Sequence, residues 1–184
     1  MTELLDRLQQ DHWNLSHVLL VFDSLLDRFH EGAEPDYELM SEMLKYLERY
    51  ADQIHHPSEE DIFERLRARS NESLPVLDLL SKQHELIGQL NRRFRQSLEG
   101  IMHEAVLRRD EVEAQGRELV KTLREHLNVE EEEAFPMARE RLSERDWDEL
   151  RENLPSLNDP MFSDAAHARF RSLLKHLMDQ AEVV

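Results

Sequence analysis

The sequence contains no cysteine, which excludes disulfides, thiolate zinc sites, cysteine-ligated iron–sulfur clusters and cysteine nucleophiles as chemistry internal to the chain. Any metal site must therefore use mainly nitrogen and oxygen donors. Glycine (4) and proline (6) are also scarce, and 34% of the residues are charged. This composition is typical of a helical bundle, so we expect an all-α protein with almost no strand.

Positive charge and long apolar runs are lacking as well. Lysine and arginine number 23 against 40 aspartate and glutamate residues, which gives a formal net charge of -17 and argues against nucleic acid as a partner. No run approaches the roughly 20 apolar residues that span a bilayer, and residues 1–6 lack the basic-then-apolar order of a signal peptide. We therefore expect a cytoplasmic protein with no membrane partner.

Four stretches of the chain place apolar residues at steps of three and four, which predicts four long helices. The first covers about residues 3–30. The second follows Pro35, the third follows Pro75, and the fourth begins near Asp110, with Glu113 completing a capping box. With a length of 184 residues, these stretches predict one compact domain built as a four-helix bundle.

Two further helices are predicted after the bundle. Ser143 opens a short helix that holds Trp147, and Asp159 and Pro160 begin a final helix that turns Phe162 and other apolar residues inward. We therefore divide the chain into a bundle at residues 1–142 and a C-terminal helical extension at residues 143–184 that packs on it.

The two halves of the bundle resemble each other. His12 lies 43 residues before His55, and His84 lies 42 residues before His126. The halves thus superpose with an offset of 71 or 72 residues. This repeat predicts a site with approximate twofold symmetry.

The second and fourth helices each carry histidine and glutamate four residues apart, as His55 with Glu59 and His126 with Glu130. This spacing stacks both side chains on one helix face, where an imidazole and a carboxylate can bind the same metal ion or neighbouring ones. In the second helix the apolar stripe runs through His55 and Glu59. The pair one residue later, His56 with Glu60, would face outward, but it stays open as an alternative because Pro57 removes a helix hydrogen bond and could rotate the register.

Ionised carboxylates on inward helix faces need a compensating charge, since burying one alone costs several kcal/mol. A pair of dications would supply it. A nitrogen and oxygen donor set suits iron or manganese and leaves positions for water, an oxo group, dioxygen or nitric oxide. The predicted metal ligands are His12, His55, Glu59, His84, His126 and Glu130.

The remaining histidines fall off the apolar stripes or at helix ends, and we expect His17, His30, His103, His167 and His176 to be surface residues. Tyr50 lies about one turn before His55 on the same side. Its hydroxyl either hydrogen-bonds an oxygen species in the site or the ring simply packs, and packing is the favoured interpretation.

The segment His55-His56-Pro57-Ser58-Glu59-Glu60, with the ending Glu130-Glu131 to Phe135-Pro136 of the fourth helix, resembles the hemerythrin HHE cation-binding family and its bacterial single-domain members. The resemblance covers about residues 5–140 and implies an up-down four-helix bundle around two iron ions with oxo or hydroxo and carboxylate bridges, for which manganese or zinc could substitute. The implied ligands are His12, His55 (or His56), Glu59 (or Glu60), His84, His126 and Glu130.

Two subgroups of that family differ from this chain. Oxygen-carrying hemerythrins have a second histidine four residues after the position of His84, where this sequence has Gly88. Members that repair iron–sulfur centres under nitrosative stress have an additional region with cysteine, a residue that is absent here. The resemblance therefore implies metal binding more directly than either of these activities.

Three functions follow as expectations. The first is a di-iron protein, not an enzyme, that binds or senses dioxygen or nitric oxide, or handles iron. The second is a redox enzyme in which the same centre turns over peroxide or nitric oxide or takes part in iron–sulfur repair. The third is a metal-free helical interaction module, and a homodimer is compatible with all three.

Overall fold

The computed structural model describes residues 3–153 together with residues 159 and 175. Every regular element in this part of the chain is helical, which confirms the all-α prediction. No helix within it is long and apolar enough to cross a membrane. Nearly all of the predicted final helix, including Pro160, Phe162, His167 and His176, lies outside the described residues, so the division at residues 142 and 143 stays a prediction.

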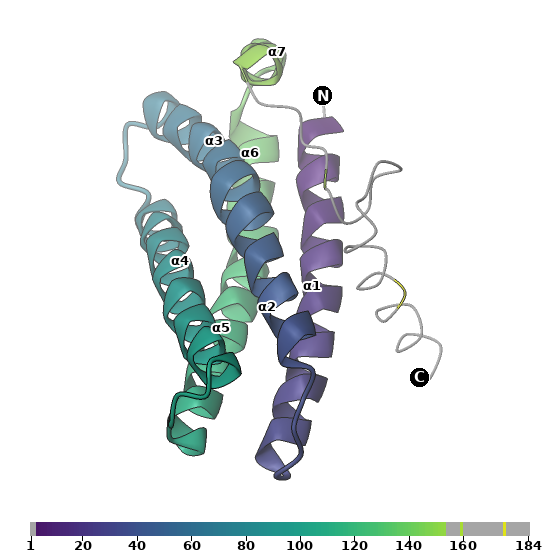
Figure 1. The fold of residues 1–184 in the computed structure, drawn as a ribbon. Helices are drawn as coiled ribbons and strands as arrows, with labels where there is room; N and C mark the ends of the chain where they lie inside the picture. The colour runs from purple at the N-terminus through teal and green to yellow at the C-terminus, as the bar shows by residue number, and fades with distance from the viewer. Residues whose placement is uncertain (1–2, 154–158, 160–174, 176–184) are drawn as a thin grey trace.

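Four long helical rods run up and down side by side (Figure 1). α1 and the rod of α5 are neighbours, α4 lies against both α2 and α5, and α1 also contacts α2. The predicted four-helix bundle is therefore present. The rods are α1 (Glu3–His30); α2 (Tyr37–Tyr46), η1 (Leu47–His55) and α3 (His56–Arg69); α4 (Pro75–Met102); and α5 (Arg109–Val129), η2 (Glu130–Ala134) and α6 (Phe135–Arg141).

Local chemistry sets most rod ends. After α1 the chain turns at Gly32, whose φ of 89° lies in the left-handed region that a side chain would disfavour. Asp36 then begins α2 by accepting a hydrogen bond from the backbone N–H of Leu39 at 2.9 Å. Pro75 stands at the first turn of α4, where its missing N–H costs nothing.

The start of α5 differs from the prediction. Arg108 precedes the helix and no side-chain cap is formed, so the capping box expected from Asp110 and Glu113 was wrong. Asp110 instead accepts hydrogen bonds from the guanidinium of Arg108, at 2.6 and 3.2 Å. The exposed Asp110 carboxylate thus pairs with the side chain of Arg108 and does not form the predicted cap.

The short helix predicted at Ser143 is confirmed as α7 (Glu144–Asn153). The Ser143 backbone N–H and hydroxyl both donate to Asp146, at 3.0 and 2.6 Å, and the Asp146 N–H donates back to the Ser143 hydroxyl. This reciprocal cap fixes the first turn. Asp146 also accepts from Arg65 and Arg69, and Trp147 is buried, so α7 is tied to the end of the bundle.

Two π-helical segments interrupt the second and fourth rods. η1 spans residues 47–55 and η2 spans residues 130–134, and each ends two residues before a proline, Pro57 or Pro136. A proline inside an α-helix lacks a donor and clashes with the carbonyl four residues earlier, and widening the preceding turn relieves both problems. A π-turn also rotates everything after it relative to an α-helix.

The core consists of two apolar clusters separated by a polar layer. On α1, Leu8 belongs to the smaller cluster near α7 and Leu15 to the larger one, with His12 between them. The same order holds on α4, where His84 lies between Leu80 and Ile87. The apolar clusters thus hold the four rods rigidly on both sides of one polar layer.

Candidate metal centre

Five imidazoles and two carboxylates from all four rods meet in the polar layer. All six predicted ligands are among them, and the seventh member is His56. The exposed fraction is 0% for His55, Glu59, His126 and Glu130, 2% for His56 and 4% for His12, and the side chain of His84 is 8% exposed.

The carboxylate of Glu59 lies between imidazoles of three rods. Its Oε1 is 3.1 Å from the Nε2 atoms of both His12 and His55, and its Oε2 is 3.4 Å from Nε2 of His84. One oxygen therefore faces His12 and His55, and the other faces His84.

The carboxylate of Glu130 has a similar place on the fourth rod. Its Oε2 lies 3.1 Å from Nε2 of His126 and 3.4 Å from Nε2 of His12, and its Oε1 lies 3.5 Å from Nε2 of His84. Glu59 and Glu130 thus connect the two histidine pairs from opposite rods. Each carboxylate thus faces its own-rod histidine together with His12 and His84, which agrees with the approximate twofold symmetry read from the sequence at the level of residues.

The outward ring nitrogens of His12 and His84 face carboxylates in matching ways. Nδ1 of His12 lies 2.8 Å from Glu131, and Nδ1 of His84 lies 2.7 Å from Glu60. Each partner follows a central glutamate in the sequence. Such outer contacts fix the tautomer and ring orientation of a metal-binding histidine, leaving Nε2 free toward the centre.

The outer partners of His55 and His126 differ. Nδ1 of His55 lies 3.4 Å from buried Asp11, which accepts a hydrogen bond of 2.8 Å from the hydroxyl of Tyr50. Nδ1 of His126 instead lies 3.2 Å from the amide oxygen of Gln83. The favoured packing interpretation of Tyr50 agrees with its complete burial, and its hydroxyl is committed to Asp11.

His56 points into the bundle, so the expectation that it faces outward was wrong. η1 supplies the reason, because its wide turns rotate the following residues and bring both His55 and His56 inside. Pro57 was the signal that pointed to this rotation. Glu60 does turn outward, with a side chain that is 32% exposed, and there it holds His84 instead of joining the centre.

Among the histidines predicted to be at the surface, His30 and His103 are exposed and His17 is partly exposed. None of the three contributes to the buried cluster.

Without a metal ion, the imidazoles and carboxylates stabilise each other's charged forms. Burial lowers the pKa of His12, His55 and His84, but the facing carboxylates outweigh it, raising the pKa of His55 to about 9 and of His84 to about 11, with that of His12 also well raised. Conversely, burial raises the pKa of Glu59, but His55 and the other imidazoles outweigh it and hold it well below its ordinary value. His56 differs, since burial and nearby His84 lower its pKa, so it is a neutral ring.

Donor atoms at the centre fit metal ions better than they fit one another. Nε2 of His55, His56, His84 and His126 and both oxygens of Glu130 are buried without a hydrogen-bond partner in the described structure. Leaving such atoms unsatisfied is costly. The donors form two groups that share Glu59, and within each group the donor atoms lie within 4.8 Å of one another. One group is His12, His55 and Glu59; the other is His56, Glu59, His84 and His126. A role for these side chains as metal ligands stays a prediction.

Comparison with known proteins agrees with this geometry. Neither the curated proteins nor the solved structures include a significant match to the chain. The family model described as hemerythrin HHE cation binding domain matches residues 3–138, a segment that holds every residue of the buried cluster. The chain therefore belongs to the hemerythrin HHE cation-binding domain family.

Proposed function

We propose that this protein is a non-haem di-iron protein that binds or senses a small ligand such as dioxygen or nitric oxide. Metal binding is what membership of the family implies, and the buried histidine and glutamate cluster fits a metal site. One observation carries the finer proposal: there are two donor groups, and they share a carboxylate. A single metal would not use both groups.

The first metal position would be held by His12 and His55, and the second by His84 and His126, with Glu59 and Glu130 reaching both. Imidazole and carboxylate donors without thiolate suit iron or manganese. Bound iron would supply redox activity and affinity for small diatomic ligands. The chain's own residues orient the donors, and apolar clusters lie on two sides of them.

The metal-free interaction module is the weaker explanation. It would be favoured by His55 and Glu59 pointing into solvent, whereas both are 0% exposed. Burying two carboxylates costs several kcal/mol each without compensating charge. Two bound metal ions would supply the positive charge that compensates the buried carboxylates.

The direct test is to load the purified chain with ferrous iron, oxidise it in air and record its optical spectrum. We expect near-ultraviolet bands of an oxygen-bridged ferric pair that bleach with dithionite, and a spectral change when nitric oxide meets the reduced protein. Iron-loaded protein that shows neither bands nor a response to nitric oxide would refute the proposal.

A further inference from the structure

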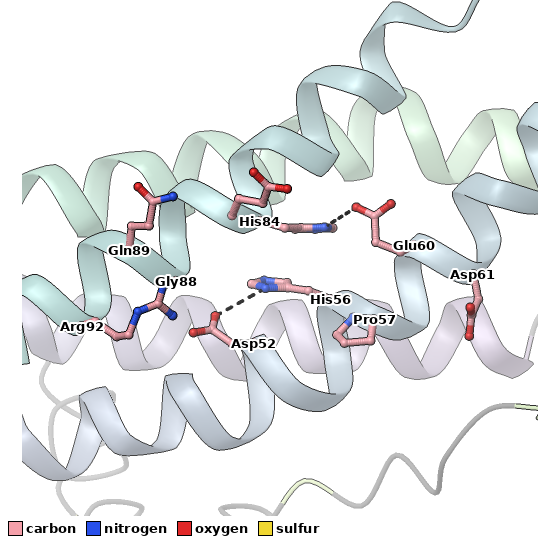
Figure 2. A pocket seen from close by; sticks show the side chains of 10 residues that line it. Asp52, His56, Pro57, Glu60, Asp61, His84, Gly88, Gln89 and Arg92 are labelled. Atoms are coloured by element: carbon pink, nitrogen blue, oxygen red, sulfur yellow. Dashed lines mark hydrogen bonds and ion pairs between the residues drawn. The ribbon is translucent and has the colours of Figure 1, made fainter.

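A pocket of about 590 Å³ opens on the face between the second rod and α4, beside the buried cluster (Figure 2). The imidazoles of His56 and His84 line its inner part, while Asp61, Glu85 and Arg92 are among its exposed lining residues. It therefore connects solvent with one side of the second donor group. The first donor group, with His12 and His55, does not line it.

His56 is held in this pocket as a metal donor would be. Its ring stacks on that of His84, with centroids 4.3 Å apart and planes inclined by 15°. Its Nδ1 faces Asp52 at 3.5 Å, the contact drawn in Figure 2, and its Nε2 is buried without a hydrogen-bond partner in the described part of the chain. One nitrogen is thus oriented from outside, and the other is left free.

Gly88 makes room for this arrangement. It lies one turn after His84, and a Cβ at this position would be 3.3 Å from the guanidinium of Arg92 and 3.5 Å from the carboxylate of Asp52. A larger side chain here would compete with Asp52 for the space beside His56. The space that α4 leaves empty at Gly88 is therefore bordered by the Asp52 carboxylate of the second rod.

We propose that His56 is a third imidazole donor of the second metal position and that its ring occupies the donor site facing the pocket. The inference rests on the dimetal centre proposed above. It makes the two positions unequal, with two imidazoles at the first and three at the second. His56 then keeps small anions and other ligands that enter the pocket away from the second metal.

The test replaces the ring by His56→Gly and supplies free imidazole, which is small enough for the pocket. We expect His56→Gly to bind the second iron on the order of tenfold or more weakly, with a shifted optical spectrum. Added imidazole should restore both. The iron-loaded variant should bind one more equivalent of azide per chain than the unaltered protein does.

Two further variants control for folding and for histidine loss in general. His56→Asn keeps a polar side chain of similar reach and should show a smaller version of the same defects, while His103→Gly, at an exposed histidine, should match the unaltered protein. Far-ultraviolet circular dichroism reports whether each variant is folded. If folded His56→Gly and His56→Asn both match the unaltered protein in iron affinity, spectrum and azide titration, His56 is not a donor. Unaltered protein that binds no iron would overturn the proposed function itself.

Discussion

The second and fourth rods carry the same motif, histidine and glutamate four residues apart, but they deliver different side chains to the centre. In the second rod the π-helical segment η1 precedes Glu59 and ends at His55, so the neighbouring His56 is also turned inward. In the fourth rod η2 begins only at Glu130, after His126, and the residue next to His126 is Leu127, which packs in the larger apolar cluster.

His56 and Leu127 are both buried, so the type of residue that follows the motif histidine decides how many donors a rod contributes. The halves of the molecule agree where the sequence repeat is strict, as in the matching contacts of His12 with Glu131 and His84 with Glu60. They differ at His56 and in the partners of His55 and His126, which are Asp11 and Gln83. The centre is thus symmetric in its carboxylates and asymmetric in its imidazoles.

The largest expected effect tests the symmetric part. Glu59→Gln and Glu130→Gln each replace a carboxylate that faces both metal positions, so each should lower the iron content of the purified protein from two ions per chain to well below one. Elemental analysis with protein quantification gives the ratio. Glu64→Gln and Glu133→Gln, which alter exposed carboxylates on the same rods, serve as matched controls and should keep most of the iron. Equal iron in all four variants would contradict the bridging role.

Metal binding should depend strongly on pH. In the metal-free protein His12, His55 and His84 have raised pKa values, about 9 for His55 and about 11 for His84, so all three hold an extra proton at pH 7. Iron needs neutral imidazoles, so binding should release these protons, and affinity should rise with pH until the pH passes about 9 for His55 and about 11 for His84. Calorimetry in buffers of different ionisation enthalpy measures the release. Binding without proton release would show that the rings are already neutral.

The same shifts predict how pH affects the stability of the metal-free protein. Because folding raises the pKa of His55 and His84 from an unfolded value near 6.5, their stabilising charge is fully present below that pH. It is lost as pH rises through about 9 and then about 11. Urea unfolding should therefore show lower stability at pH 10 than at pH 7 without iron. Iron-loaded protein should show a much smaller difference.

A smaller effect is expected where the halves differ in their outer partners. Asp11→Asn removes the carboxylate behind His55 and should weaken iron binding roughly 10- to 100-fold. Gln83→Glu adds a carboxylate behind His126 and should not weaken it. Competition with a chelator of known affinity measures both. If Asp11→Asn binds iron as tightly as the unaltered chain, the contact with His55 has no role in the site.

The smallest effect concerns the π-turn. Pro57→Ala restores an N–H that could bond the carbonyl of Gln53 in an ordinary helical turn, so metal-free protein should gain on the order of 1 kcal/mol in stability. Iron-loaded protein should gain less, because the relaxed turn no longer favours an inward His56. Thermal unfolding with and without iron compares the two. Equal gains in stability with and without iron would show that the π-turn does not affect the metal centre.

The fold could be predicted well from the sequence because apolar residues recur at helical spacing along the whole length of each rod. Such stripes predicted four helices, and on α1 the stripe residues Leu8, Leu15 and Leu19 are fully buried. The capping box at Asp110 failed because Arg108, a residue outside the pattern, competes for the carboxylate. Periodicity reports the face of a helix, whereas helix ends depend on single contacts.

Most side chains of the candidate site could also be predicted from the sequence. Spacing alone selected the six side chains that meet in the polar layer, but an α-helical register placed His56 outside. Only the three-dimensional effect of η1 brings it in. Partners such as Asp11, Glu131 and Gln83 could not be selected from spacing, since surface-type residues of this kind occur on every helix.

The measurement that tests the central claim most directly is an anaerobic titration of the metal-free chain with ferrous iron, with the signal of free iron recorded at each addition. Two donor groups that share Glu59 predict a break at two equivalents in the unaltered protein and no sharp break in Glu59→Gln. A break at one equivalent, or the same curve for both proteins, would contradict a shared dimetal centre.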